Sequence, residues 1–395
     1  MASLYGDQTD LFVRQNENED FSKVAFMKVP QGVDHAIVMR QIFGRKVAKE
    51  KLPSFFACED ITYPVKLSME QCSSELTATY KQKVAATFSD HREMVDLTAG
   101  FGVDFYFISR LFEKATYVER NEELHSIASH NFNALGASNV TTANNDAVHV
   151  LNSINEKISL IFLDPARRDK QGRKTVEIED CEPNVLELKD MLLQKADTVM
   201  IKFSPMLDIK SAVRKLECVS EIHIVSVDGE CKELLLVLKK DCKRIKCFCA
   251  NLGKKEELIS FYADENNEEE IKYSNPMNYI YEPNASLMKI GAHGVLAKKY
   301  NISKIAPFSH LFTSDNLVEN FAGRSFEVKS VFQMNKKELK ESLNGISKAN
   351  IAVRNFPLSA EELKKKLKLK DGGEDYIFGT TLQDSKHVLI LCKKA

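Results

Sequence analysis

Strand-like and helix-like segments alternate from residue 94 to residue 238, and this alternation constrains the fold more than any other feature. The apolar run at 158–163 is uninterrupted and stops at Asp164-Pro165, as expected of a strand buried on both faces. Helical segments such as 122–135 end at a glycine, here Gly136. Because strands joined by helices usually run parallel, this order predicts an α/β fold with helices on both faces of one sheet.

The last two strands of this region are expected to form a hairpin. Residues 221–227 and 233–238 are rich in strand-forming residues, and Asp228-Gly229 lies between them. Asp-Gly between two such runs favours a tight turn with positive φ angles. The sheet should therefore finish with an antiparallel pair.

A turn with two glycines connects the first strand of the region to its first helix. Glycine lets the backbone approach a ligand without a Cβ in the way, and the next helix offers free N–H groups. A dinucleotide site would need a third glycine where Phe105 stands, whereas an acidic residue before the turn suits a cationic ligand. A purely structural turn is the alternative. The expected cofactor site comprises Asp96, Thr98, Ala99, Gly100, Phe101, Gly102 and Asp104.

Carboxylates also follow the next two strands. Glu119 ends the second strand, 19 residues beyond Gly100, and its carboxylate can accept two hydrogen bonds from ribose hydroxyls. Asp146 follows the third strand and can accept an adenine amino group. The plainer interpretations are an exposed strand-tip glutamate and ordinary Asn-Asn-Asp turn material. We include the adjacent Arg120 and Ala147 in the expected cofactor site.

The fourth strand ends in a proline turn that is followed by two arginines. Asp164-Pro165 lies at the strand end where open α/β sheets place their sites, and a rigid turn can aim a carboxylate at an amine. Such a dipeptide can also simply end a strand. Arg167 and Arg168 open the segment 166–174, which has a net charge of +4 and can bind a phosphate.

The four pieces together resemble the motif series of class I S-adenosylmethionine-dependent methyltransferases. They are Asp-Leu-Thr-Ala-Gly-Phe-Gly-Val-Asp, Glu-Arg-Asn, Asn-Asp-Ala and Asp-Pro-Ala-Arg-Arg, within residues 90–240. The first two are similar to a bacterial small-subunit ribosomal RNA guanine-N2 methyltransferase. Asp-Pro-Ala-Arg lacks the aromatic residue of the Asp-Pro-Pro-Tyr amine methyltransferases and is closer to the Asp-Pro-Pro-Arg of certain RNA methyltransferases. The resemblance implies a Rossmann-like, seven-stranded sheet and S-adenosyl-L-methionine as cofactor.

The resemblance also implies a role for each cofactor residue. Asp96 and Asp104 would lie near the charged end of the cofactor, Glu119 near the ribose, and Asp146 near the adenine edge. Phe101 would pack either on the cofactor or in the core.

On the acceptor side, Asp164 and Pro165 would be the catalytic residues that face a nitrogen of the substrate. Arg167 or Arg168 would hold a phosphate, or the base itself through a bidentate contact. The expected activity is therefore methyl transfer to a base amine or another nitrogen in RNA. A protein or small-molecule acceptor, an inactive RNA-binding module and a nicotinamide-dependent oxidoreductase are the alternatives; Phe105 and the hairpin disfavour the last.

Four domains are expected from the pattern. They are a helical N-terminal module (1–88), the cofactor-binding domain (89–240), a small α/β connecting region (241–324) and a small α/β domain (325–395). The last segment, with the order β-α-β-α-β-β, is similar to the THUMP-like domain attached to some bacterial methyltransferases, which implies RNA binding.

Local patterns in these domains predict further elements. Ser68 and Gln71 form a possible capping box for a helix that runs to Ala86. Residues 251–278 are polar and are expected to be a loop, and 285–300 are expected to form one helix.

Composition narrows the class of protein. The 55 basic and 56 acidic residues give a net charge of −1, which disfavours a protein that coats nucleic acid and leaves RNA contacts to local patches. The nine cysteines are scattered, as in reduced intracellular proteins, and no metal site is expected. Because no signal pattern or long apolar stretch is present, we expect a cytoplasmic protein that does not associate with membranes. The oligomeric state is left open.

Overall fold

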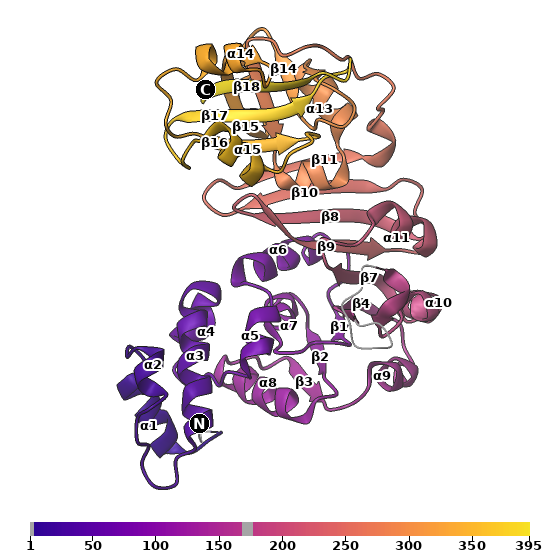
Figure 1. Ribbon diagram of the computed structural model, residues 1–395. Helices are drawn as coiled ribbons and strands as arrows, with labels where there is room; N and C mark the ends of the chain where they lie inside the picture. The colour runs from indigo at the N-terminus through magenta and orange to yellow at the C-terminus, as the bar shows by residue number, and fades with distance from the viewer. Residues whose placement is uncertain (1–3, 168–176) are drawn as a thin grey trace. The chain divides into compact units, whose positions relative to one another are not determined.

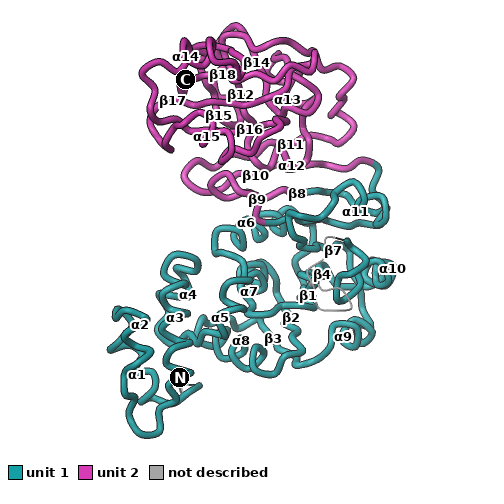
Figure 2. The backbone as a smooth tube through the Cα atoms, viewed as in Figure 1, with its two compact units in different colours: residues 1–222, 233–243 teal, residues 223–232, 244–395 magenta. Residues whose placement is uncertain are grey.

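The structure, a computed structural model, describes residues 4–167 and 177–395 and contains two compact units. Unit 1 comprises residues 1–222 and 233–243, and unit 2 comprises residues 223–232 and 244–395 (Figure 2). Of the helices in the described part of the chain, none is both long and apolar enough to span a bilayer.

Unit 1 is built on a sheet whose first five strands are parallel (Figure 1). The strand order β3-β2-β1-β4-β7-β9-β8 confirms the α/β class and the methyltransferase-like sheet, with β9 antiparallel to β7. The turn Asp228-Gly229 has φ angles of 49° and 85°, as predicted for the closing hairpin. The strands are β1 (Glu93–Asp96), β2 (Lys114–Val118), β3 (Val140–Ala143), β4 (Ile158–Leu163), β7 (Ala196–Phe203), β8 (Val219–Val227) and β9 (Glu230–Leu238).

Helices connect these strands, and most of the helices begin after a polar capping residue. Asn121, Asp146, Asn184 and Asp208 each accept a backbone N–H in the first turn, which satisfies donors that a helix N-terminus leaves free. The helices are α7 (Val103–Ser109), α8 (Glu122–Ala134), α9 (Ala147–Ser153), α10 (Val185–Lys195) and α11 (Ile209–Leu216). After β4, the short strands β5 (Ala166–Arg167) and β6 (Cys181–Glu182) pair antiparallel, and the 3₁₀ turn η1 (Ile178–Asp180) precedes β6.

The N-terminal helices pack onto the same unit. Phe55 and Tyr63 contact Phe101 in one buried cluster, so this part of the chain shares a hydrophobic core with the cofactor turn. The helices are α1 (Asp7–Asn16), α2 (Phe21–Val24), α3 (His35–Lys51), α4 (Pro53–Ala57), α5 (Lys66–Gln71) and α6 (Glu75–Ala85).

One helix start in this region was predicted wrongly. The chain is extended at Cys72, so α5 and α6 are separate, and Ser74 rather than Ser68 provides the cap by accepting the N–H of Thr77 at 3.2 Å. Two serine-containing starts lie within seven residues of each other, and the sequence pattern does not distinguish them.

The longer segment of unit 2 begins with two strands, of which the second was not predicted. β10 (Lys246–Leu252) and β11 (Glu257–Tyr262) pair antiparallel, and β10 lies beside β8, whose last residues belong to this unit. The expectation of a loop over 251–278 was therefore wrong for its first part, where Ile259 and Phe261 point into the core and alternate with exposed residues. The helix expected at 285–300 is divided at Gly291 (φ 73°) into α12 (Ala285–Ile290) and α13 (His293–Tyr300). The 3₁₀ turn η2 is Ala263–Glu265.

The rest of unit 2 is a second sheet with the order β13-β14-β12-β15-β18-β17-β16. From β15 onward, the predicted order β-α-β-α-β-β is confirmed, including the capping box of Ser359 and Glu362. The elements are β12 (Tyr279–Pro283), β13 (Ser303–Lys304), β14 (Phe312–Ser314), β15 (Gly323–Phe332), α14 (Lys336–Ser342), β16 (Asn350–Arg354), α15 (Ala360–Leu367), β17 (Asp375–Thr381) and β18 (His387–Lys394).

Candidate active site

The site residues of unit 1 gather at one edge of its sheet. Because β1, β2, β3, β4 and β7 run parallel, their carboxyl ends meet at the same edge. Asp96 ends β1, Glu119 follows β2, and Asp164 follows β4. Acidic groups that are widely separated in sequence are thereby brought to this one edge of the sheet, which we call the rim.

The glycine turn is held to strand β2. Gly100 donates its N–H to Oε2 of Glu119 at 3.0 Å, and its carbonyl accepts the hydroxyl of Tyr117 at 2.5 Å. Both Gly100 (φ 55°) and Gly102 (φ 82°) are in the left-handed region. The side chain of Phe101 is buried in the core beside Phe55, so it packs in the core, one of the two placements considered.

The remaining cofactor residues have polar contacts around this turn. The other oxygen of Glu119 accepts the N–H of Asn121 at 2.8 Å, and the carboxylate stays half-buried at the rim. Asp146 is exposed and caps α9 by accepting the N–H of Val148 at 2.8 Å, which places Ala147 as the buried first residue of that helix. Arg120 is exposed and forms an ion pair with Glu182 at 2.6 Å.

Asp164 is tied to the glycine turn through its backbone. Its N–H donates to Oγ1 of Thr98 at 2.6 Å, while its side chain remains 39% exposed. Pro165 is buried, and Arg167 pairs through its backbone with Cys181. Arg168 lies outside the described residues.

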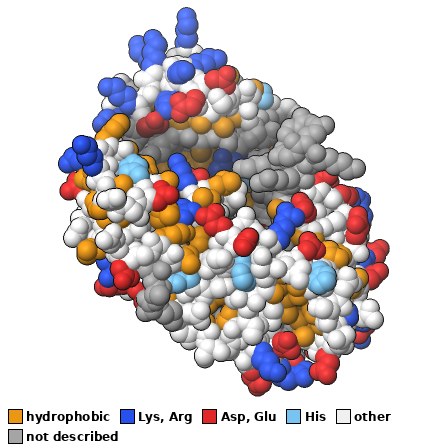
Figure 3. Space-filling model, turned by 90° about the horizontal axis from the view of Figure 1, so that it is seen from below, with side chains coloured by type: hydrophobic (Ala, Val, Ile, Leu, Met, Phe, Trp, Pro, Cys, Tyr) orange, Lys and Arg blue, Asp and Glu red, His pale blue; other side chains and the backbone are white. Residues whose placement is uncertain are grey.

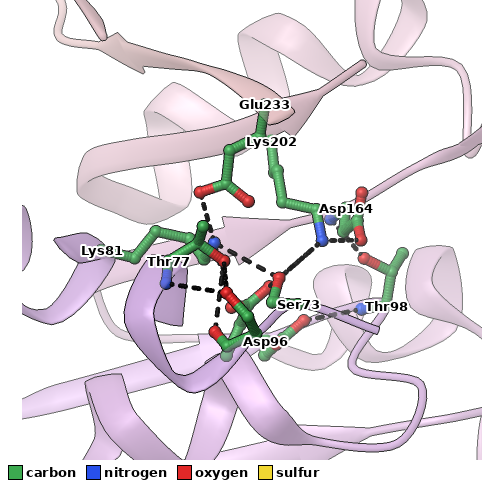
Figure 4. A network of polar contacts seen from close by, with 10 residues as sticks. Ser73, Thr77, Lys81, Asp96, Thr98, Asp164, Lys202 and Glu233 are labelled. Atoms are coloured by element: carbon green, nitrogen blue, oxygen red, sulfur yellow. Dashed lines mark hydrogen bonds and ion pairs between the residues drawn. The ribbon is translucent and has the colours of Figure 1, made fainter. Parts of the chain in front are cut away.

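A buried network of charged groups, which was not predicted, lies directly behind this rim (Figure 4). Oδ2 of Asp104 accepts the hydroxyl of Ser73 at 2.7 Å and contacts Nζ of Lys202 at 3.2 Å. Lys81, which is fully buried, contacts Asp104 at 3.1 Å and Glu233 at 2.5 Å. Three carboxylates, those of Asp104, Asp164 and Glu233, therefore share the ammonium groups of two lysines, Lys81 and Lys202. Asp96 is near enough to interact electrostatically with this network.

The pKa values of two carboxylates at this site, Asp96 and Asp104, are shifted in opposite directions. Burial alone would raise the pKa of Asp104, but Lys81 and Lys202 beside it lower the pKa to about 2, so this group is ionised. Burial raises the pKa of Asp96 well above its usual range, and the neighbouring Asp104 and Asp164 raise it further. Oδ1 of Asp96 accepts the N–H of Thr98 at 3.0 Å, and this hydrogen bond helps to hold the start of the glycine turn in place.

Lys202 is the member of the network that sequence patterns came nearest to revealing. It is the one charged residue inside the otherwise apolar end of strand β7, Val199–Phe203. An ionisable residue in a buried strand requires a partner, and that requirement indicates a site even without a known motif. Ser73, Lys81 and Glu233 have no such local signal, because they meet only through the fold.

Three family models match parts of the chain. Residues 79–223 match a family described as conserved hypothetical protein 95, residues 279–321 match a ferredoxin-like domain, and residues 323–394 match a THUMP domain-like family. No curated protein is significantly similar to the chain.

Among solved structures, a protein of Porphyromonas gingivalis W83 that is assigned as a methyltransferase is 30% identical to the chain. The match covers 98% of this chain and 97% of that one, with a TM-score of 0.86. An rRNA methylase of Streptococcus thermophilus is 17% identical over 42% of this chain and 94% of its own, with a TM-score of 0.31. The M. capricolum protein TrmK, solved with S-adenosylhomocysteine, is 12% identical over 41% of this chain and 68% of its own, with a TM-score of 0.32. The near-complete match at 30% identity decides the family: the chain belongs to the class I S-adenosylmethionine-dependent methyltransferases that carry a C-terminal THUMP-like domain.

Proposed function

We propose that the protein transfers a methyl group from S-adenosylmethionine to a nitrogen atom in RNA. The observation that carries the proposal is the rim itself. The exposed carboxylate of Asp164 is hydrogen-bonded through its backbone to Thr98 of the glycine turn, which puts a candidate acceptor-binding group beside a candidate cofactor-binding turn.

The residues of the turn fit the cofactor. A Cβ at Gly100 would meet no atom within 4 Å, so there is open space above the backbone where a ligand can approach. Each oxygen of Glu119 accepts one backbone N–H, and a carboxylate oxygen has a second lone pair left for a ribose hydroxyl. Asp146 is exposed at the end of the neighbouring strand, where an adenine amino group would be bound.

The chemistry assigned to the protein groups is modest. S-adenosylmethionine supplies an electrophilic methyl group on a sulfonium, and the acceptor nitrogen must present its lone pair while it loses one proton. Asp164 accepts the N–H of that nitrogen, which fixes the direction of the lone pair, and its carboxylate can take up the proton. Pro165 limits the backbone freedom of the turn that carries Asp164.

RNA as the substrate is supported by two features of the chain. The segment 166–174, which follows Asp164 along the chain, is strongly basic, and residues 323–394 are THUMP-like. Acidic and basic side chains are mixed over the described surface seen in Figure 3, as the near-zero net charge implies. Binding of a polyanion would therefore depend on local patches rather than on the overall charge.

Asp164→Ala tests the proposed role of Asp164. We expect the variant to lose methyl transfer while it still binds S-adenosylmethionine, because the groups assigned to the cofactor remain in place. Transfer of tritiated methyl groups to total RNA from a deletion strain, followed by nucleoside analysis, measures activity, and calorimetry measures cofactor binding. Asp197→Ala, at the start of β7 in an exposed pair with Lys157, is the matched control and should behave as wild type. If Asp164→Ala also loses cofactor binding, the proposed catalytic role of Asp164 is wrong.

A further inference from the structure

Lys202 contacts the acceptor side and the cofactor side of the rim at the same time. Its Nζ lies 2.5 Å from Oδ2 of Asp164, 3.2 Å from Oδ2 of Asp104 and 3.2 Å from the hydroxyl oxygen of Ser73 (Figure 4). An ammonium group has three N–H donors, and three acceptors are within reach of them. The direction of the lysine side chain is therefore fixed.

The surroundings of Lys202 keep it charged. Its side chain is only 12% exposed, and burial alone would lower its pKa, but Asp164, Asp104 and Glu233 raise the pKa well above the usual value. An ammonium that does not lose its proton cannot act as a base. Its contribution must come through the groups that it holds.

The group left partly free by this arrangement is Asp164. Lys202 holds Oδ2, and the backbone N–H is bound to Thr98, so the carboxylate is fixed at two points. Within the described part of the chain, no residue forms a hydrogen bond to the second oxygen, Oδ1. With respect to the described residues, the carboxylate is thus held in one orientation with Oδ1 left for a substrate.

Part of the support for Lys202 comes from outside the matched methyltransferase region. Ser73 lies between α5 and α6, before the stretch 79–223 that matches the family model, and Asp104 lies in the first turn of α7. The helical N-terminal part therefore supplies a hydroxyl to the site as well as packing for the core.

We propose that Lys202 is a positioning residue, which holds the carboxylate of Asp164 toward the acceptor nitrogen and is itself held by Ser73 and Asp104. The inference rests on the proposed role of Asp164. It gives the N-terminal helices a part in the reaction, and it links the acceptor-binding carboxylate to the helix that follows the cofactor turn.

Lys202→Met, which removes the charge and keeps the length of the side chain, tests this role. We expect kcat for methyl transfer to fall about a hundredfold while KM for S-adenosylmethionine changes less than about threefold, because a misplaced reacting group affects the chemical step. Lys202→Arg should restore part of kcat, since it keeps the charge. Lys157→Met, which removes the exposed partner of Asp197, is the matched control and should keep the wild-type kcat. A Lys202→Met enzyme with unchanged kcat would overturn the proposal.

A double variant decides whether Lys202 acts through Asp164. If it does, Asp164→Asn with Lys202→Met should be about as active as Asp164→Asn alone, because nothing remains to be positioned. If the fold losses of activity in the two single variants multiply in the double variant, Lys202 acts independently of Asp164, and the proposal is wrong. Circular dichroism and calorimetric cofactor binding establish that each variant is folded.

The link between the two residues is also measurable without any acceptor. In protein labelled with ¹⁵N-lysine, the ammonium resonance of Lys202 should shift in Asp164→Asn and stay unchanged in Asp197→Asn. An unchanged resonance in Asp164→Asn would overturn the positioning role. A wild-type protein that binds the cofactor but methylates no RNA would instead overturn the proposed function.

Discussion

Two glycines of the cofactor turn have different reasons for being glycine. At Gly102, a Cβ would lie 2.6 Å from Cζ of Phe132 and 3.3 Å from Cε2 of Tyr117, so the backbone packs directly on the core. At Gly100, a Cβ would point into open space. Both positions have positive φ, but only Gly102 also lacks room for a side chain.

Gly102→Ala should therefore destabilise the protein more than Gly100→Ala. We expect a loss of about 2–4 kcal/mol in the free energy of unfolding for Gly102→Ala, from the left-handed backbone and the overpacked core together. Gly100→Ala should cost about 1 kcal/mol, the backbone term alone, and should weaken cofactor binding instead. Urea unfolding and calorimetry with S-adenosylmethionine measure the two effects. Equal losses of stability in the two variants would contradict this interpretation.

Single residues of the site were predictable from the sequence only where they directly follow a recognisable strand. Glu119 and Asp164 follow strands whose pattern is plain, and parallel pairing then places them on one rim. Ser73, Lys81 and Glu233 carry no such signal, because the contact of Lys81 with Glu233 joins residues 152 positions apart. Charge pairing between distant segments depends on tertiary structure, which no local periodicity encodes.

At the scale of elements, helix α13 begins with a buried basic cluster. Nε2 of His293 lies 3.0 Å from Nδ1 of His310, and Nδ1 of His293 lies 3.3 Å from Nζ of Lys304 and 3.4 Å from the exposed Glu268. Burial, together with the adjacent Lys304 and His310, lowers the pKa of His293 to about 4. The imidazole is therefore neutral in the folded protein at neutral pH.

This neutral histidine should make unit 2 sensitive to mild acid. Because the pKa of His293 is lower in the folded than in the unfolded state, its contribution to stability is present above pH 6.5 and is lost as the pH falls toward 4. Between pH 7 and 5 the loss is roughly 2 kcal/mol. Urea unfolding at the two pH values should show a smaller difference for His293→Asn than for wild type. His387→Asn, at an exposed position, should keep the wild-type difference, and an equal difference in all three proteins would refute the assignment.

Elements were predictable to the extent that their own residues carry the pattern. Strand β4 has the predicted bounds, because it is buried throughout, and helix α8 begins at the predicted residue, because Asn121 caps it. β11 was missed because polar residues surround the turn that joins it to β10, and β10 is itself held beside β8, which precedes it in the chain. Pairing with a distant strand makes these segments regular, and that pairing is absent from any short window of sequence.

At the scale of the whole molecule, Lys81 joins the start and the end of unit 1. It lies on α6 and is fully buried between Asp104 of α7 and Glu233 of β9. Burial raises the pKa of Glu233, although Lys81 acts in the opposite direction. A buried charge of this kind is tolerated only when its partner is present.

Lys81→Met should destabilise unit 1 by about 3–5 kcal/mol, because Glu233 is left buried without its ammonium partner. Lys81→Met combined with Glu233→Leu should recover most of the loss, since two apolar groups replace the pair. Thermal or urea unfolding followed by circular dichroism measures both proteins. A single variant as stable as wild type, or a double variant no better than the single one, would show that the pair does not carry this energy.

The hairpin of β8 and β9 is shared between the two units, so no single cut in the chain separates them. The chain leaves unit 1 after residue 222, returns at 233 and leaves again after 243. A truncated protein that stops at 243 would keep the tip of the hairpin and lose β10, the strand that covers its edge. An uncovered strand edge is a template for intermolecular pairing, so such fragments should aggregate. Any attempt to separate the two units, by design or by proteolysis, must therefore deal with a chain that passes between them three times.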